Sequence, residues 1–175
     1  EGDVDREVAD FEVPPGRRGL AASQLAGTVR AIRVDRGQPV GPGDVVAEVY
    51  SPELLTMQQD LLKTHLEAQL AATTLASLKN VPGAAARRVW ELESQVSGLR
   101  SRGEALRRRL LTAGLTPAEV ERLVTRSEMV TAVPVRAPIA GVVVNFDKVL
   151  GQAVAAHEPL FEVHDLSSPP VRAFV

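Results

Sequence analysis

The chain has 175 residues, of which 45% are hydrophobic and 24% charged, and its formal net charge of −2 gives no general attraction for nucleic acid or anionic membranes. It contains no cysteine, which excludes a disulfide framework and a thiolate metal site. No apolar run approaches the ~18 residues of a membrane span. Because the chain does not begin with Met, we expect Glu1 to be a processing boundary, with any signal peptide or lipid anchor upstream.

Residues 1–26 are predicted to form an N-terminal strand and loop segment. Apolar and polar residues alternate from Val4 to Val13, which indicates a short strand. The sequence PPGRRG at residues 14–19 can continue neither a helix nor a central strand, because proline fixes φ and has no amide hydrogen to donate. We therefore expect a turn or loop before Gly27.

Residues 27–50 recur as residues 141–164 at a constant offset of 114 and without a gap. The Val-rich ends of each copy predict short strands, and the middles, which contain Gly and Pro, predict tight turns. Two copies are too few for a solenoid, which needs about three stacked repeats. The repeat thus predicts one small β domain made of two pseudo-symmetric halves, residues 27–50 and 135–166, separated by an insertion. Identical pairs are Gly27/Gly141, Val29/Val143, Gly37/Gly151, Gln38/Gln152, Val40/Val154, Glu48/Glu162 and Val49/Val163.

Residues 51–134, the insertion, have helical periodicity. Ser51 and Pro52 suit the N-cap and the first position of a helix over about 52–79, which Pro82 and Gly83 end. A matching pattern predicts a second helix over about 84–113, and a Thr-Pro pair predicts a third over 117–126. The apolar seam consists of Leu54, Met57, Leu61, Thr64, Ala68, Ala71, Leu75 and Leu78 in the first helix, and of Val89, Leu92, Val96, Leu99, Gly103, Leu106, Leu110 and Ala113 in the second.

Two long helices joined by a short loop must pair antiparallel, and their narrow stripes bury each other and little else. We therefore expect an α+β fold in which a coiled-coil hairpin projects from the β domain. The two connections, at residues 50–51 and 132–137, are expected to be thin, so that the hairpin tilts on the β domain.

The sequence predicts no catalytic, cofactor-binding or metal-binding residue. A nucleophilic site needs Ser or Cys with a nearby base, and the three His residues are isolated in the sequence. Met57 occupies a seam position, where Met fills gaps in apolar packing. His65 has no partner three or four residues away. His157 and His164 are seven residues apart, which leaves a shared site open as an alternative to two separate surface positions.

The second helix is strongly basic, and three interpretations of its charge are open. A solvated coiled-coil face is favoured over a nucleic-acid patch, because aromatic stacking partners are absent. Packing against acidic neighbours is the third. The basic residues are Arg87, Arg88, Arg100, Arg102, Arg107, Arg108 and Arg109.

A split β module with a hairpin spliced between its halves resembles the periplasmic adaptor proteins (membrane fusion proteins, HlyD-like) of tripartite efflux systems. The likeness lies in GTV at Gly27 through VGPGDVV at Val40, in VRAPIAGVV at Val135, and in Asp165-Leu-Ser followed by VRAFV at Val171. The sequences VYSPELL (residues 49–55) and RRLLTAGLTPAE (residues 108–119) are similar to the heavy-metal efflux (CusB-like) branch.

The resemblance implies a lipoyl-like (biotinyl-like) β module, with residues 167–175 starting a β-barrel domain to which residues 1–26 are also candidates to belong. It further implies a non-catalytic periplasmic adaptor, anchored to the inner membrane by a segment outside this chain. Such an adaptor bridges an inner-membrane transporter of the resistance-nodulation-division (RND) type to an outer-membrane channel in the export of heavy-metal cations. Several copies form a ring, and nucleic acid is not a partner.

The hairpin tip is the expected contact with the channel, through Asn80, Val81, Pro82, Gly83, Arg87 and Arg88. Two alternatives remain for the function. One is an adaptor of an ATP-driven exporter or type I secretion system, which uses the same modules. The other is a biotinyl or lipoyl carrier domain, in which a Lys on a tight turn between the halves bears the prosthetic group.

Overall fold

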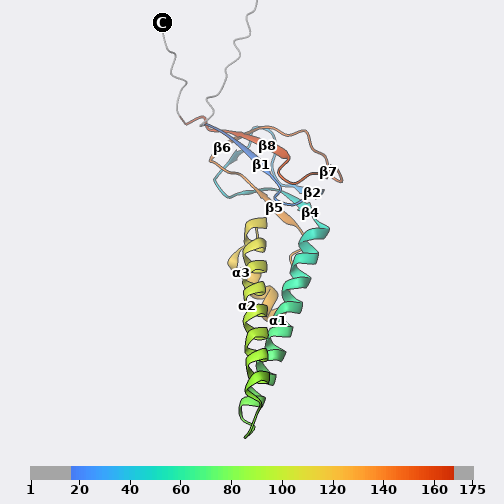
Figure 1. Ribbon diagram of the computed structural model, residues 1–175. Coiled ribbons are helices and arrows are strands. Elements are labelled where there is room, and N and C mark those ends of the chain that lie inside the picture. Colours follow the sequence, from blue (N-terminus) through green and yellow to red (C-terminus); the bar gives the residue numbers. More distant parts are fainter. Residues whose placement is uncertain (1–16, 168–175) are drawn as a thin grey trace, which may run out of the picture.

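The computed structural model describes residues 17–167, so the strand expected at Val4–Val13 and the segment expected to begin a β-barrel at residues 168–175 lie outside it. A β-sandwich lies at one end, and a long helical hairpin projects from it (Figure 1). The elements in chain order are β1 (Arg18–Ala22), β2 (Gly27–Ile32), β3 (Pro39–Val40), β4 (Val45–Tyr50), α1 (Pro52–Lys79), α2 (Ala86–Ala113), α3 (Pro117–Arg126), β5 (Val133–Arg136), β6 (Gly141–Asn145), β7 (Ala153–Val154) and β8 (Pro159–His164).

The sandwich consists of two four-stranded antiparallel sheets, with the strand orders β1-β8-β6-β3 and β5-β4-β2-β7. Adding the offset of 114 to the bounds of β3 and β4 gives those of β7 and β8, and β2 and β6 begin at matching residues. Replacing each strand by its counterpart in the other half also converts one strand order into the other, with β5 in the place of β1. The predicted α+β fold with two pseudo-symmetric halves is thus confirmed.

The halves begin earlier than the repeat indicates. β1 pairs with β8, where Gly19 lies opposite Val163, and the equivalent register in β5 and β4 places Val133 opposite Val49. Residues from Arg18 onward therefore belong to the sandwich, and the boundary expected at Gly27 is corrected. No residue of β1 is identical to its counterpart 114 positions later, because strand position here is fixed by non-local pairing rather than by residue identity.

Reciprocal backbone hydrogen bonds interlock the two halves. The amide of Gly37 donates to the carbonyl of Val143 at 2.6 Å, and the amide of Gly151 donates to the carbonyl of Val29 at 2.7 Å. Both glycines have a positive φ, 84° and 83°, which a side chain would disfavour. The repeated Gly-Gln turn therefore adds to the strand pairs, such as β1–β8 and β4–β5, that join the two halves.

The hairpin is an antiparallel pair of 28-residue helices, each about 42 Å long at about 1.5 Å per residue (Figure 1). Every predicted seam residue is buried or half-buried, and in α1 burial decreases toward the tip. α2 begins at Ala86 rather than at residue 84, because the amide of Ala84 is taken by a turn, donating to the carbonyl of Val81 at 3.3 Å. None of the helices within residues 17–167 is both long and apolar enough to cross a membrane.

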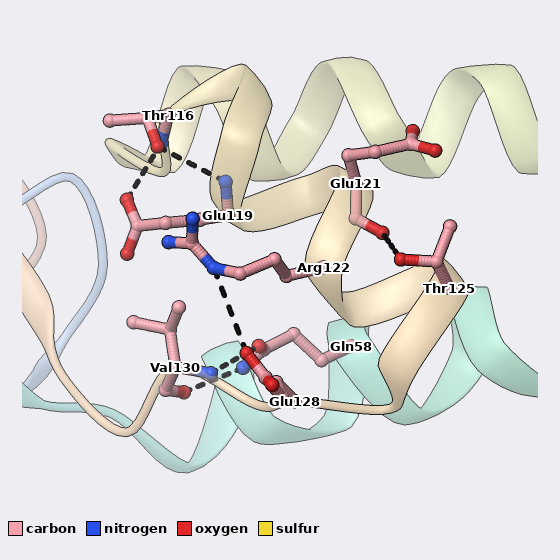
Figure 2. A network of polar contacts seen from close by, with 8 residues as sticks. All are labelled: Gln58, Thr116, Glu119, Glu121, Arg122, Thr125, Glu128 and Val130. Carbon is pink, nitrogen blue, oxygen red and sulfur yellow. Dashed lines mark hydrogen bonds and ion pairs between the residues drawn. The ribbon is translucent and has the colours of Figure 1, made fainter.

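The root of the hairpin is packed against the sandwich, which corrects the expectation of thin connections. One continuous hydrophobic cluster joins Val46 of the sandwich to Leu54 and Leu110 of the hairpin and to Leu123 of α3. α3 begins with a capping box, in which Thr116 and Glu119 exchange hydrogen bonds of 3.2 and 2.9 Å (Figure 2). The short helix thus closes the root instead of merely connecting it.

A buried amide completes this brace. Gln58 of α1 is fully buried, and its side chain both donates to the carbonyl of Val130 and accepts from the amide of Val130, each at 2.8 Å (Figure 2). Arg122 of α3 forms an ion pair at 3.7 Å with Glu128, which follows the helix (Figure 2). The segment that returns from α3 to β5 is therefore fixed to α1 by specific polar contacts.

Candidate partner-binding site at the hairpin tip

The tip is a tight turn between two regular helices. α1 ends at Lys79, and the amides of Asn80 and Val81 both donate to the carbonyl of Leu78. Gly83 then takes a positive φ of 80°, with open space around its α-carbon, which lets the chain reverse. The structure therefore brings Asn80, Val81, Pro82 and Gly83 together at the far end of the hairpin, as the sequence predicted for the position of the turn.

The surface of the tip is apolar. Val81 is 53% exposed, and the neighbouring Pro82 is also exposed. Trp90, in the first turns of α2, is 66% exposed and adds a large aromatic surface that the sequence analysis missed. Its exposure could have been predicted from its position, because Trp90 lies between the seam residues Val89 and Leu92, outside the stripe that α1 covers. An exposed aromatic with a polar ring nitrogen suits a protein contact.

The charged residues of the tip are held by acidic residues of α2. The two carboxylate oxygens of Glu91 face Arg87 at 3.4 Å and Arg88 at 3.5 Å. Across the hairpin, Lys79 forms an ion pair with Glu93 at 2.9 Å. Arg87 and Arg88 thus lie in the first turn of α2, beside the apolar turn, and share one carboxylate between them.

The N-terminus of α2 has no side-chain cap. The N-cap is Ala85, which makes no side-chain hydrogen bond to the free amides, and the first turn contains no acidic residue. Ser, Thr, Asn or Asp at this position typically adds about 0.5–2 kcal/mol. Small apolar side chains therefore occupy the tip where a polar cap would stabilise the helix.

The histidines considered as metal ligands are not brought together. His157 lies in the turn before β8 and His164 ends that strand, which is about 17 Å long at about 3.4 Å per residue. His164 instead contacts Glu162 at 2.9 Å, and this hydrogen bond together with nearby Arg18 lowers the pKa of Glu162. Within residues 17–167, no group of three or more His, Cys, Asp or Glu side chains is placed to hold a metal ion. Met57 is buried at the hairpin root, which confirms its packing role.

The lysines bear on the carrier alternative. The chain contains three, and Lys63 and Lys79 lie on α1. Lys148, in the loop after β6, forms an ion pair with Glu158 at 2.8 Å, and its side chain is only 17% exposed. The hydrogen bond from Lys148 lowers the pKa of Glu158. No lysine of the chain is therefore presented on an exposed turn between the two halves, as a carrier requires.

Comparison with protein families decides between the adaptor and the carrier hypotheses. Residues 20–165 match the model of the CzcB-like barrel-sandwich hybrid domain. The chain belongs to this family. It is thus a membrane fusion protein, or adaptor, of the heavy-metal efflux type, as the sequence resemblance predicted. Adaptors of this kind are periplasmic and generally non-catalytic.

Individual relatives agree with the family. The nickel-cobalt-cadmium resistance protein NccB of Alcaligenes xylosoxydans xylosoxydans is 30% identical over 182 aligned positions, which cover 99% of this chain and 42% of NccB. The crystal structure of ZneB from Cupriavidus metallidurans superposes with a TM-score of 0.66 at 24% identity, covering 89% of this chain and 64% of ZneB. A MacA-MexA chimera that contains the Pseudomonas aeruginosa MexA α-hairpin gives 0.58 at 17% identity, covering 85% and 48%.

The chain spans less than half the length of NccB and less than two thirds of ZneB. The two solved structures share the fold, the sandwich together with its hairpin, at low identity. The adaptor family and the architecture of the sandwich are therefore established. What the adaptor connects and which ions it serves are matters of proposal.

Proposed function

We propose that this adaptor bridges an inner-membrane RND-type transporter to an outer-membrane channel in the export of divalent heavy-metal cations. The observation that carries the proposal is the shape of the molecule: a hairpin about 42 Å long stands on a CzcB-like sandwich and ends in an exposed apolar tip. A long projection that is packed at its root and exposes apolar residues at its tip suits a spacer that must reach a distant partner.

The tip is the proposed contact with the channel. Its centre is Val81 and Trp90, the two large exposed apolar residues at that end of the hairpin. Arg87 and Arg88 flank them and favour a partner whose rim is acidic. Trp and Arg are among the residue types that most often dominate the binding energy of protein interfaces.

The sandwich faces the other partner. The amide of Asp165, which follows β8, donates to the carbonyl of Arg17, which precedes β1, at 2.8 Å. An anchor in the inner membrane and a ring of several copies complete the proposed assembly.

The cargo is proposed from the family and from NccB, whose name gives nickel, cobalt and cadmium. Divalent cations of this kind are the substrate class for the whole system. The adaptor's own contribution is mechanical, because the tip and the root contain apolar, amide and arginine groups rather than a set of metal ligands.

In-cell crosslinking tests the bridge. A photoreactive amino acid is placed at Val81 in the full-length protein, and the control carries it at Gln69, an exposed residue in the middle of α1. After irradiation, adducts are identified by mass spectrometry. We expect the Val81 probe to capture an outer-membrane channel, and we expect an RND transporter to copurify with the adaptor.

Recovery of an ATP-driven transporter would replace the RND assignment by the exporter or secretion alternative. Failure of the Val81 probe to capture a channel, while the Gln69 probe does, would contradict the role of the tip.

A further inference from the structure

We propose that the crevice between the hairpin root and the sandwich binds a small organic anion, a molecule with a negatively charged head such as a carboxylate on an apolar body. This inference goes beyond the proposed function, because it does not depend on which transporter or channel the adaptor joins. The root crevice is defined here by Gln24 and Leu25 of the turn after β1, Met57 of α1, Arg108 and Thr112 of α2, and His157 of the turn before β8.

The root crevice has the size and the position of a ligand site. Its volume is about 380 Å³, and small-molecule sites typically measure about 300–1,000 Å³. Such sites are common at interfaces between structural units, where two rigid surfaces meet. Here two turns of the sandwich face the last turns of α2, so a bound molecule would contact the sandwich and the hairpin at the same time.

The sandwich wall of the crevice is fixed without a ligand. Ser23 is fully buried, and its hydroxyl donates to the carbonyl of Leu25 at 2.6 Å and accepts from the amide of Leu25 at 3.3 Å. The amide of His157 donates to the carbonyl of Ser23 at 2.8 Å. The turns that carry Gln24 and His157 are therefore tied to each other, which lowers the ordering cost of binding.

The polar groups of the crevice favour an anion. Arg108 and Arg109 line it together with the hydroxyl of Thr112 and the amide of Gln24, and no acidic residue does. Arg108 is exposed and makes no ion pair among residues 17–167, whereas Arg109 lies 3.8 Å from Glu53. Guanidinium groups bind carboxylates with paired hydrogen bonds and repel metal cations. The charge of the crevice thus selects a ligand of negative charge.

The floor of the crevice is apolar, which favours an organic ligand over a simple ion. Met57 is 4% exposed, and Leu25 is half-buried beside it. Ala105 and Ala113 of α2 add two small side chains to the same surface. An inorganic ion would leave these groups in contact with water, whereas an apolar body would cover them.

The backbone of His157 supplies an independent argument. Its φ of 64° is in the left-handed region, which residues with a side chain adopt less readily than glycine. The equivalent residue of the other half is Gly43, with a φ of 84°. The same turn is thus built with glycine in one half, and in the other half with a histidine that lines a cavity. Backbone strain of this kind is concentrated at ligand sites.

Methionine methyl NMR tests the site directly. Naphthoate is titrated into the full chain, whose two methionines carry carbon-13 methyl groups. Met57 lines the crevice and Met129 does not, so Met129 is an internal control. We expect a saturable shift of the Met57 signal alone. Naphthalenemethanol, which lacks the charge, and inorganic phosphate, which lacks the apolar body, should bind at least about tenfold more weakly.

Substitutions separate binding from folding. Arg108→Gln and His157→Gly should each weaken naphthoate binding about two- to fivefold, the range of an exposed charged contact. Arg102→Gln is the matched control, because it removes the same charge from an exposed position of α2 outside the crevice and should leave binding unchanged. His157→Gly should keep or raise the thermal unfolding midpoint, because glycine adopts a positive φ without strain. A merely structural histidine would instead lower this midpoint when replaced.

Four results would overturn the inference. The first is the absence of a saturable Met57 shift with naphthoate. The second is equal affinity for naphthalenemethanol, which would exclude recognition of charge, and the third is equal affinity for phosphate, which would exclude a role of the apolar floor. The fourth is equal weakening by Arg102→Gln, which would show a general effect of helix charge. None of these results affects the proposed bridge, which the Val81 crosslink tests separately.

Discussion

At the scale of the residue, two glycines allow the sandwich to close. A β-carbon on Gly27 would overlap the carbonyl oxygen of Tyr50, and one on Gly141 would overlap the carbonyl oxygen of His164. These are equivalent positions of the two halves, each at the start of a strand that passes closely over the end of another. The backbone approach there is too near for any side chain.

Alanine at either position should therefore destabilise the sandwich. We expect Gly27→Ala and Gly141→Ala each to lower the free energy of unfolding by about 1–3 kcal/mol, the range of an overpacked core. Gly98→Ala is the control, because nothing lies within 4 Å of its added carbon. In the interior of α2 it should stabilise by about 0.5–1 kcal/mol. Chemical denaturation measures all three, and equal stability of Gly27→Ala and wild type would refute the steric argument.

Residue identity alone predicted the shared role of these glycines, but not every residue with a positive φ. The repeat aligns Gly27 with Gly141, so their shared role was visible in the sequence. It also aligns Gly43, with a φ of 84°, with His157, which takes a φ of 64°. A histidine in this conformation could not be anticipated, because the backbone there follows the pseudo-symmetry of the fold rather than the preference of the residue.

At the scale of the element, the brace at the hairpin root depends on Gln58. Its side chain satisfies both backbone groups of Val130, at 72 residues' separation in sequence. Leucine in its place would fit the helix but leave the amide and the carbonyl of Val130 without these partners. We expect Gln58→Leu to lower the free energy of unfolding by about 1–3 kcal/mol.

Amide hydrogen exchange gives the specific readout for this substitution. The amide of Val130 should be protected in the wild type and exchange rapidly in Gln58→Leu. Gln69→Leu, on the exposed face of the same helix, should change stability by less than about 0.5 kcal/mol and leave Val130 protected. Unaltered protection of Val130 in Gln58→Leu would show that the clamp does not hold the root.

Elements were predictable where their signals are local. α1 and α3 have the predicted bounds, because Ser51 and Thr116 cap them and Pro52 and Pro117 occupy their first positions. The residues of β1 were assigned to the N-terminal segment, as a turn or loop, because their place in the sandwich depends on pairing with β8 from the far end of the chain. The brace was missed for the same reason: a buried glutamine in a seam looks like any polar helix residue until its distant partner is known.

At the scale of the whole molecule, the sandwich, the hairpin root and α3 share one hydrophobic cluster. The root is therefore held to the sandwich by packed side chains as well as by the two chain connections. The hairpin seam and its projection from the β module were predictable from periodicity and loop length. The exposure of Trp90 was not, because it depends on which part of α2 the seam leaves uncovered.

The most direct test of the account is growth on metal salts. A host that lacks the gene is complemented with the wild type or with a Val81→Asp, Trp90→Ala variant, both verified by expression level and helical content, and grown on Ni, Co, Cd and Zn salts. The account predicts that the wild type restores tolerance to at least one of these metals and that the tip variant does not. Equal tolerance with and without the gene on every metal would contradict it.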